Sequence, residues 1–272
     1  MTPSQKKHYI EMAARLTRDG ITTVSIDVSV LVCHPFWFHE DLFYGMESYF
    51  AEYYNGKKSF YDIRIKAEKT ARKKRILGDT TLADIYAVLA KKARLSADSA
   101  QKLMERETEL EVHFAEPRRC GVQLLRDAVE SGKRVILTCD TYLPEDAVKR
   151  ILAKCGIEST EENRTYRALL ISNSLKVNKD SGSFYPAFLG RFKLKPSQLI
   201  HVGSDIRSDV EMAISVGIEA QYLPSCFELM AKSDSFANFT ANRTNAELAK
   251  KDCLSLRCAM AAYAIREFDF PM

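Results

Sequence analysis

Polar side chains lie near the ends of three predicted strands. Asp27 lies in the apolar run 21–32, Thr138–Asp140 ends the stretch KRVILTCD, and Gly203–Asp205 ends the stretch QLIHVGSD. In a parallel sheet, ligands bind outside the carboxyl ends of the strands. Carboxylates, hydroxyls and a thiol collected at this edge could bind a metal ion through oxygen, hold a phosphate or attack an electrophile.

Strands and helices alternate in the part of the chain that must position these residues. After residue 117, helical patterns separate the apolar stretches that predict strands, which are residues 133–140, 168–172, 198–205 and 218–224. Such alternation is typical of right-handed β-α-β units, which form a parallel sheet. We therefore predict an α/β fold in which the three polar groups share one edge of the sheet.

Asp27 interrupts the run ITTVSIDVSVLV, which extends from Ile21 to Val32. The run is rich in β-branched residues and is predicted to be one strand. A buried carboxylate is costly unless it is paired or hydrogen-bonded, so its place in the run needs a reason. Asp27 could cap the following turn or could be a functional carboxylate. The polar groups on the other strands favour the functional interpretation.

Apolar residues recur at helical spacing almost throughout residues 36–119. This segment has roughly eighty residues, the size of a small helical domain. We therefore predict a core of residues 1–35 and 117–225, a helical insertion of residues 36–116, and a C-terminal helical extension of residues 226–272 that packs on the core. The extension carries an apolar stripe of small residues that could also contact a partner.

The composition of the 272-residue chain is that of an ordinary globular protein, with 46% hydrophobic and 28% charged residues. A net charge of +4 is too balanced to indicate a nucleic-acid partner, and the basic run 69–75 is interpreted as a solvated helix face. No signal-peptide core and no stretch near the roughly 20 apolar residues of a membrane span occur. We expect a cytoplasmic protein whose seven cysteines are mostly reduced.

The order of the polar residues resembles the four motifs of the haloacid dehalogenase (HAD) superfamily. That family has an Asp nucleophile at a strand end, a Ser or Thr ending a second strand, a Lys, and an acidic pair after Gly-Asp. The corresponding stretches here are Val24–Ser29, Ile136–Asp140, Lys179 and Gly203–Asp209. The resemblance covers residues 20–225 and implies a Rossmann-like HAD core with an inserted helical cap of the C1 type.

The resemblance implies phosphohydrolase chemistry at these positions. Asp27 would attack phosphorus to form an aspartyl-phosphate, and Lys179, with Lys176 as the alternative, would hold the phosphate charge. Magnesium would bind to Asp27 together with Asp205 or Asp209.

Two further groups would contact the substrate. Thr138, Cys139 and Asp140 would form the phosphate-binding strand end, and His34, at the entrance to the cap, could contact the substrate.

Four positions depart from the family pattern. Ser29 replaces the acid/base Asp, and losing general acid–base help costs about 10²–10⁴-fold in rate. Leu31 replaces a Thr, and Ser204 replaces the first acidic residue after Gly203. Cys139 replaces the usual Ser with a weak donor. Thr138 could substitute for it only if the strand shifted by one residue, which would turn its side chain to the other face.

Two segments, Ile136–Val148 and Phe60–Glu68, are similar to a HAD subgroup associated with bacterial glycosyltransferases at surface-polysaccharide loci. This leaves three hypotheses. The first is a phosphohydrolase-fold protein with weak or no activity, a pseudoenzyme that binds a phosphorylated small molecule or a partner. The second is an active Mg²⁺-dependent phosphatase on a sugar phosphate. The third is an interaction module for a glycosyltransferase or a polysaccharide assembly system. The four departures favour the first.

Overall fold

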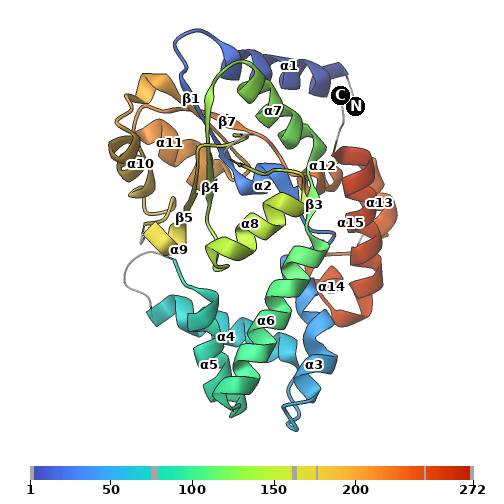
Figure 1. Ribbon diagram of the computed structural model, residues 1–272. Helices are drawn as coiled ribbons and strands as arrows, with labels where there is room; N and C mark the ends of the chain where they lie inside the picture. The colour runs from blue at the N-terminus through green and yellow to red at the C-terminus, as the bar shows by residue number, and fades with distance from the viewer. Residues whose placement is uncertain (1–2, 75–78, 161–163, 176, 242, 270–272) are drawn as a thin grey trace.

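A five-stranded parallel sheet forms the centre of the computed structural model, which describes residues 3–74, 79–160, 164–175, 177–241 and 243–269 (Figure 1). The strand order is β5-β4-β1-β6-β7. The strands are β1 (Thr23–Asp27), β4 (Arg134–Cys139), β5 (Ala168–Ile171), β6 (Leu199–Gly203) and β7 (Glu219–Tyr222). The predicted α/β fold with a parallel sheet is confirmed, and β1, which carries Asp27, is its central strand.

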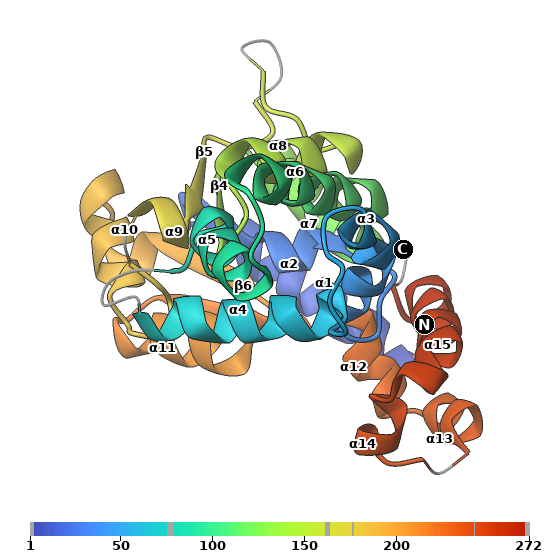
Figure 2. The ribbon, with the colours of Figure 1, turned by 90° about the horizontal axis from the view of Figure 1, so that it is seen from below.

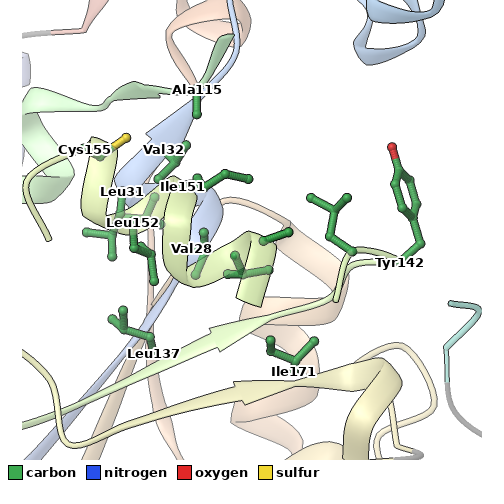
Figure 3. Close-up of a cluster of buried hydrophobic side chains, with 14 of the residues drawn as sticks. Val28, Leu31, Val32, Ala115, Leu137, Tyr142, Ile151, Leu152, Cys155 and Ile171 are labelled. Atoms are coloured by element: carbon green, nitrogen blue, oxygen red, sulfur yellow. The ribbon is translucent and has the colours of Figure 1, made fainter. Parts of the chain in front are cut away.

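Helices cover both faces of the sheet and bury alternate strand residues. On one face lie α1 (Pro3–Thr17), α7 (Arg119–Glu130) and α8 (Glu145–Lys154); on the other lie α10 (Phe184–Phe192) and α11 (Met212–Ser215). Figure 3 shows Ile151 and Leu152 of α8 packed near Leu137 of β4 and near Leu31. On the opposite face, Ile136 packs against Phe184 and Phe188 of α10. The sheet is therefore held rigidly between two apolar layers.

The predicted strand over residues 21–32 is wrong in its second half. β1 ends at Asp27, and the next residues form the short helix α2 (Val28–Leu31) before β2 (Val32–Cys33). Asp27 is the N-cap of α2, because its side chain accepts a hydrogen bond from the Ser29 backbone N–H. Val28, Val30 and Leu31 are buried, so tertiary packing overrides their strand propensity. Asp27 therefore caps this turn, and it also lies at the edge of the sheet where the strands end.

The helical insertion lies across the carboxyl-terminal edge of the sheet (Figures 1 and 2). The chain leaves the core after β2 and returns through β3 (Glu116–Pro117), which pairs with β2 in antiparallel fashion. The side chains of Thr81 and Ser96 cap the N-termini of two of its helices. The helices between these strands are η1 (His39–Met46), α3 (Glu47–Ala51), α4 (Phe60–Lys74), α5 (Leu82–Ala93) and α6 (Ala97–Phe114).

The C-terminal helices gather at one side of the molecule (Figure 2). Arg257 of α15 forms a buried, two-pronged ion pair with Asp41 of η1, with donor–acceptor distances of 2.8 and 2.6 Å. Asp269 accepts a hydrogen bond from the Arg119 backbone N–H at 2.7 Å. The extension thus contacts both the helical insertion and the core. Its helices are α12 (Cys226–Ala231), α13 (Asp234–Thr240), α14 (Asn245–Leu248), η4 (Lys251–Cys253) and α15 (Leu254–Phe268).

Three short helices complete the described fold: α9 (Ser172–Leu175), η2 (Pro196–Gln198) and η3 (Ile206–Glu211). Within the described ranges, no helix is both long enough and apolar enough to cross a membrane.

Candidate active site

Asp27 lies at the centre of the edge where the strands end, with 6% of its surface exposed. Its Oδ1 accepts hydrogen bonds from the Ser29 backbone N–H at 2.9 Å and from the Ser29 hydroxyl at 2.6 Å. Its Oδ2 accepts from the Thr138 hydroxyl at 3.3 Å and from the Lys179 ammonium. The carboxylate is therefore fixed by donors on both oxygens.

Lys179 joins Asp27 to Asp209. Its buried ammonium donates to Asp27 and, at 2.7 Å, to Asp209 Oδ1. Burial alone would lower the pKa of Lys179, but the two carboxylates outweigh it and raise that pKa well above its ordinary value. Burial also acts against ionised Asp209, yet the lysine charge holds the pKa of that carboxyl below its ordinary value. The group is therefore a cation between two carboxylates.

The end of β6 is shaped around Asp209. Asp209 Oδ2 accepts hydrogen bonds from the backbone N–H groups of Ser204 and Asp205, at 2.9 and 3.0 Å. A Cβ on Gly203 would lie 2.2 Å from the Asp209 Cγ, so only glycine fits at this position. His201 Nε2 lies 3.4 Å from Asp209 Oδ1. Its other ring nitrogen is hydrogen-bonded to Ser25, so the histidine helps to fix the carboxylate.

Asp205 does not join this group. Its Oδ1 accepts hydrogen bonds from the Ser208 backbone N–H at 2.7 Å and from the Ser208 hydroxyl at 2.9 Å, which makes Asp205 the N-cap of η3. Its side chain is exposed. Of the three predicted metal ligands, the structure therefore brings together Asp27 and Asp209 and leaves Asp205 outside. Lys176, the alternative to Lys179, lies outside the described residues.

Two hydroxyls occupy the positions where the family pattern has carboxylates. The Ser29 and Ser204 Oγ atoms are 2.6 Å apart and hydrogen-bonded to each other. The backbone carbonyl of Ser29 accepts a hydrogen bond from Arg118 at 2.9 Å, and the same buried guanidinium donates to the Pro224 carbonyl. The sequence did not single out Arg118, because a lone arginine before a helix carries no signal of its fold-dependent contacts.

A cleft of about 330 Å³ opens between this edge and the helical insertion. Ser29, His34, Arg72, Cys139 and Asp140 are among its lining residues. Burial raises the pKa of the Cys139 thiol well above its ordinary value, so the thiol stays protonated and is a poor nucleophile. Burial also raises the pKa of Asp140, to about 6, against the opposing charge of Lys179.

Thr138 and Cys139, at the end of β4, have different roles from those predicted. The Thr138 hydroxyl reaches Asp27 in the unshifted register, in which Asp27 pairs with Thr138, whereas Cys139 lines the cleft. Asp140 accepts a hydrogen bond from the Lys179 backbone N–H at 3.3 Å. The structure therefore places all three predicted phosphate-binding residues at the cleft or at Asp27.

A second polar group lies in the wall of the same cleft. Potential metal-ligand atoms of His34, His39 and Glu111 all lie within 4.8 Å of one another. Burial opposes a charge on His39, but Glu111 raises the His39 pKa to about 9, and His39 in turn helps to lower the Glu111 pKa to about 2. His34 was predicted to contact substrate. His39 and Glu111 were missed, because Glu111 reaches the two histidines only through the packing of α6.

Comparisons with known proteins identify the fold. No protein-family model matches the chain. No curated protein matches its sequence. Among solved structures, a haloacid dehalogenase-like family hydrolase from Xanthomonas campestris is similar, with TM-score 0.52 and 18% identity over 92% of this chain and 97% of that one.

Two further solved structures have the same fold. An L-2-haloacid dehalogenase from Xanthobacter autotrophicus, with chloropropionic acid covalently bound, has TM-score 0.51 and 14% identity over 82% of this chain and 84% of that one. A candidate β-phosphoglucomutase from Thermotoga maritima has TM-score 0.51 and 15% identity over 79% and 93%. The chain therefore has the fold of HAD-like hydrolases, with a Rossmann-like core.

Proposed function

We propose that this protein is a HAD-type phosphohydrolase-fold protein with weak or no phosphatase activity, whose cleft binds a small phosphorylated molecule. The observation that carries the proposal is that the hydroxyls of Ser29 and Ser204 face each other where the family pattern has carboxylates. The acid and one metal ligand of the phosphatase reaction are thereby replaced by neutral groups. At the same edge, Lys179 contacts both Asp27 and Asp209 and keeps the position that would hold a phosphate charge.

Magnesium fits this donor set poorly. Mg²⁺ requires oxygen ligands in near-octahedral geometry and is attracted by uncompensated carboxylates. Here the Lys179 ammonium lies between the two carboxylates, and the Ser29 carbonyl already accepts a hydrogen bond from Arg118. A divalent cation would have to bind next to the lysine charge, so it gains little by entering. The proposed role therefore involves no metal-dependent step at Asp27.

Proton transfer to a leaving group is the second missing function. The Ser29 hydroxyl is hydrogen-bonded to Asp27, and it has no acidic proton at neutral pH comparable to that of a carboxylic acid. Loss of general acid help alone lowers a rate by about 10²–10⁴-fold. Asp27 keeps the position of a nucleophile, so a slow residual reaction is compatible with this site.

The cleft suits a small anionic ligand. Its volume of about 330 Å³ is at the lower end of the range of small-molecule sites, which is about 300–1,000 Å³. Arg72 lines its wall, and the lining residue Ser29 is hydrogen-bonded to Asp27, which contacts Lys179. These groups support binding of a compact phosphorylated metabolite.

The test compares phosphate release with binding. Wild-type protein should release phosphate from a panel of sugar phosphates in Mg²⁺ only slowly or not at all, while calorimetry in a chelator should detect binding of at least one of them. The double variant Ser29→Asp/Ser204→Asp should gain Mg²⁺-dependent release, and Ser215→Asp, an exposed position on α11, is the matched control. Wild-type turnover at an ordinary rate of about 1–10³ per second, abolished by Asp27→Asn, would instead show an active phosphatase.

A second candidate function is a metal-free hydrolase in which Asp27 attacks carbon. The Lys179 ammonium contacts Asp27 directly, so the protein itself supplies a positive charge beside this carboxylate. The Xanthobacter dehalogenase, which has the same fold, was solved with chloropropionic acid covalently bound. In such a reaction the carboxylate forms an ester with the substrate carbon, chloride leaves with the bonding electrons, and water then cleaves the ester. Mass spectrometry after incubation with 2-chloropropionate would detect an ester on Asp27 that is missing from Asp27→Asn. No adduct and no chloride release would exclude this candidate.

A further inference from the structure

The wall of the cleft contains a polar group that the Asp27 site does not use. His34 follows β2, His39 begins η1 and Glu111 lies in the last turn of α6, so the group joins the core to both ends of the helical insertion. Glu111 is buried, whereas the side chains of His34 and His39 are 18% and 44% exposed. One face of the group is therefore open to the cleft.

The two histidine–carboxylate distances are close to those between the ligand atoms of a tetrahedral metal centre. His34 Nε2 lies 3.3 Å from Glu111 Oε2, and His39 Nε2 lies 2.9 Å from Glu111 Oε1. An ion about 2.0–2.1 Å from each nitrogen and oxygen ligand holds its ligand atoms roughly 3.3 Å apart. Two imidazoles and one carboxylate form a ligand set that zinc and related transition metals accept, with a fourth position left open.

An unpaired buried oxygen independently indicates a cation at this place. Glu111 Oε2 is buried and has no hydrogen-bond partner among the described residues. The nearby His34 Nε2 is hydrogen-bonded to the Glu111 backbone carbonyl at 2.9 Å instead. Leaving a buried carboxylate oxygen unsatisfied is costly, and a metal ion between Glu111 and the two imidazoles would satisfy it.

A tyrosine orients the carboxylate from behind. The buried Tyr142 hydroxyl donates to Glu111 Oε1 at 2.8 Å and lies 2.9 Å from His39 Nε2. Hydrogen bonds of this kind fix the ligands of metal sites, and their loss lowers metal affinity by about 10–100-fold.

We infer that His34, His39 and Glu111 form a binding site for a divalent transition-metal ion, of the zinc class, whose open coordination position faces the cleft. On binding, the His34 ring proton moves from Nε2 to Nδ1, and the freed Nε2 leaves the Glu111 carbonyl and binds the ion. His39 Nε2 releases to solvent the proton that it shares with Glu111, and the ion takes that place. Arg72, Cys139 and Asp140 line the same cleft, so an anionic ligand could reach the fourth position.

The test is titration of chelator-treated, full-length protein with Zn²⁺ by calorimetry and with Co²⁺ by visible absorption. Wild type should bind one equivalent with the spectrum of a tetrahedral nitrogen–oxygen site. His39→Gln and Glu111→Gln should lose that equivalent, and Tyr142→Phe should bind the metal about 10–100-fold more weakly. His113→Gln, at an exposed histidine of α6, is the control and should bind as wild type does. All variants keep the seven cysteines, so thiol-bound cobalt contributes equally to each.

Each other outcome overturns the inference. Wild type that binds no equivalent would exclude the site, as would variants with unchanged binding. Mg²⁺ that competes equally with Zn²⁺ would indicate oxygen ligands and so a different site. Because the His39 side chain is partly exposed, His39→Gln should leave folding intact, and an unchanged melting temperature without metal checks this. The readout needs no substrate, so its failure leaves the proposed function at Asp27 untouched.

Discussion

Two buried groups in this molecule each place one cation between two carboxylates, and they differ in their access to the cleft. Lys179 bridges the carboxylates at the edge of the sheet. In the helical insertion, Arg64 donates to Glu107 over 2.7–3.1 Å and to Glu68 over 2.8 Å. Both cations are almost fully buried. By burial and charge alone, the two groups would be judged equivalent.

The surroundings separate them. The rings of Phe43 and Tyr142 cover the Arg64 guanidinium at 4.6 and 5.0 Å, and the Tyr86 hydroxyl donates to Glu107. Hydrogen bonds and apolar contacts therefore enclose the Arg64–Glu107 pair, whereas Glu68 is 23% exposed and pairs with Arg72. The Lys179 group instead continues through Asp27 to the Ser29 hydroxyl, and Ser29 lines the cleft. A buried ion pair indicates chemistry only where a ligand can reach it; otherwise it indicates structure.

The largest predicted effect belongs to the enclosed group. Arg64→Met should lower the free energy of unfolding by about 3–5 kcal/mol, because it leaves Glu107 charged and buried without its partner. The double variant Arg64→Met/Glu107→Leu should recover most of this loss, since it removes both charges. Urea unfolding measures both changes. Arg72→Met, at a partly exposed arginine that pairs with Glu68, is the control and should cost about 0–1 kcal/mol.

A change of less than about 1 kcal/mol in the free energy of unfolding of Arg64→Met would contradict the distinction between the Arg64 and Lys179 groups. It would mean that water reaches Glu107, and that the helical insertion encloses its ion pair no better than the sheet edge does.

The second prediction is a smaller loss of stability, in the Lys179 group, that depends on pH. Asp209→Asn should cost about 1–3 kcal/mol at pH 7, because it weakens the contact with buried Lys179. The folded-state pKa of Asp209 is depressed, so its contribution is fully present above the ordinary value of about 3.9 and is lost as the pH falls below it. Urea unfolding of both proteins from pH 7 to pH 3 should show the difference shrinking. A difference that is constant with pH would show that Asp209 acts through packing rather than charge.

The sequence predicts the sheet edge well, for a geometrical reason. Parallel strands bring their carboxyl ends together, so Asp27, the end of β4 and the end of β6 had to be neighbours once the alternation of strands and helices was recognised. Lys179 and Asp209 were identified by the order of the family motifs that the chain resembles. These residues lie in one hydrogen-bonded group in the structure.

Contacts that depend on helix packing could not be predicted in this way. The sequence does not show that Asp205 turns away to cap η3, because Asp205 and Asp209 are equivalent in the pattern until the helix start is fixed. Glu111 meets His34 only through the placement of α6, 77 residues along the chain. Arg118 reaches the Ser29 carbonyl from a comparable sequence distance. Such pairs follow from tertiary packing, and no local pattern encodes them.

The smallest predicted effect sharpens the distinction between the cleft and the enclosed group. Asp140 has a pKa of about 6, so it is mostly ionised at pH 7 and mostly neutral at pH 5. An anion in the cleft should therefore bind more tightly at pH 5, by no more than about tenfold, which corresponds to one pKa unit of interaction. Sulfate is a suitable probe because its charge is constant over this range, and His39, with a pKa of about 9, stays protonated throughout.

Calorimetric titration with sulfate at the two pH values, on wild type and on Asp140→Asn, measures this effect. The variant should bind at pH 7 as wild type does at pH 5 and should show little change with pH, whereas Asp146→Asn, at an exposed acidic residue in the first turn of α8, should follow wild type. If Asp140→Asn kept the full pH dependence, Asp140 would not face the bound anion. The charge at the cleft would then have no effect on anion binding, and the proposed anion site would have to lie elsewhere.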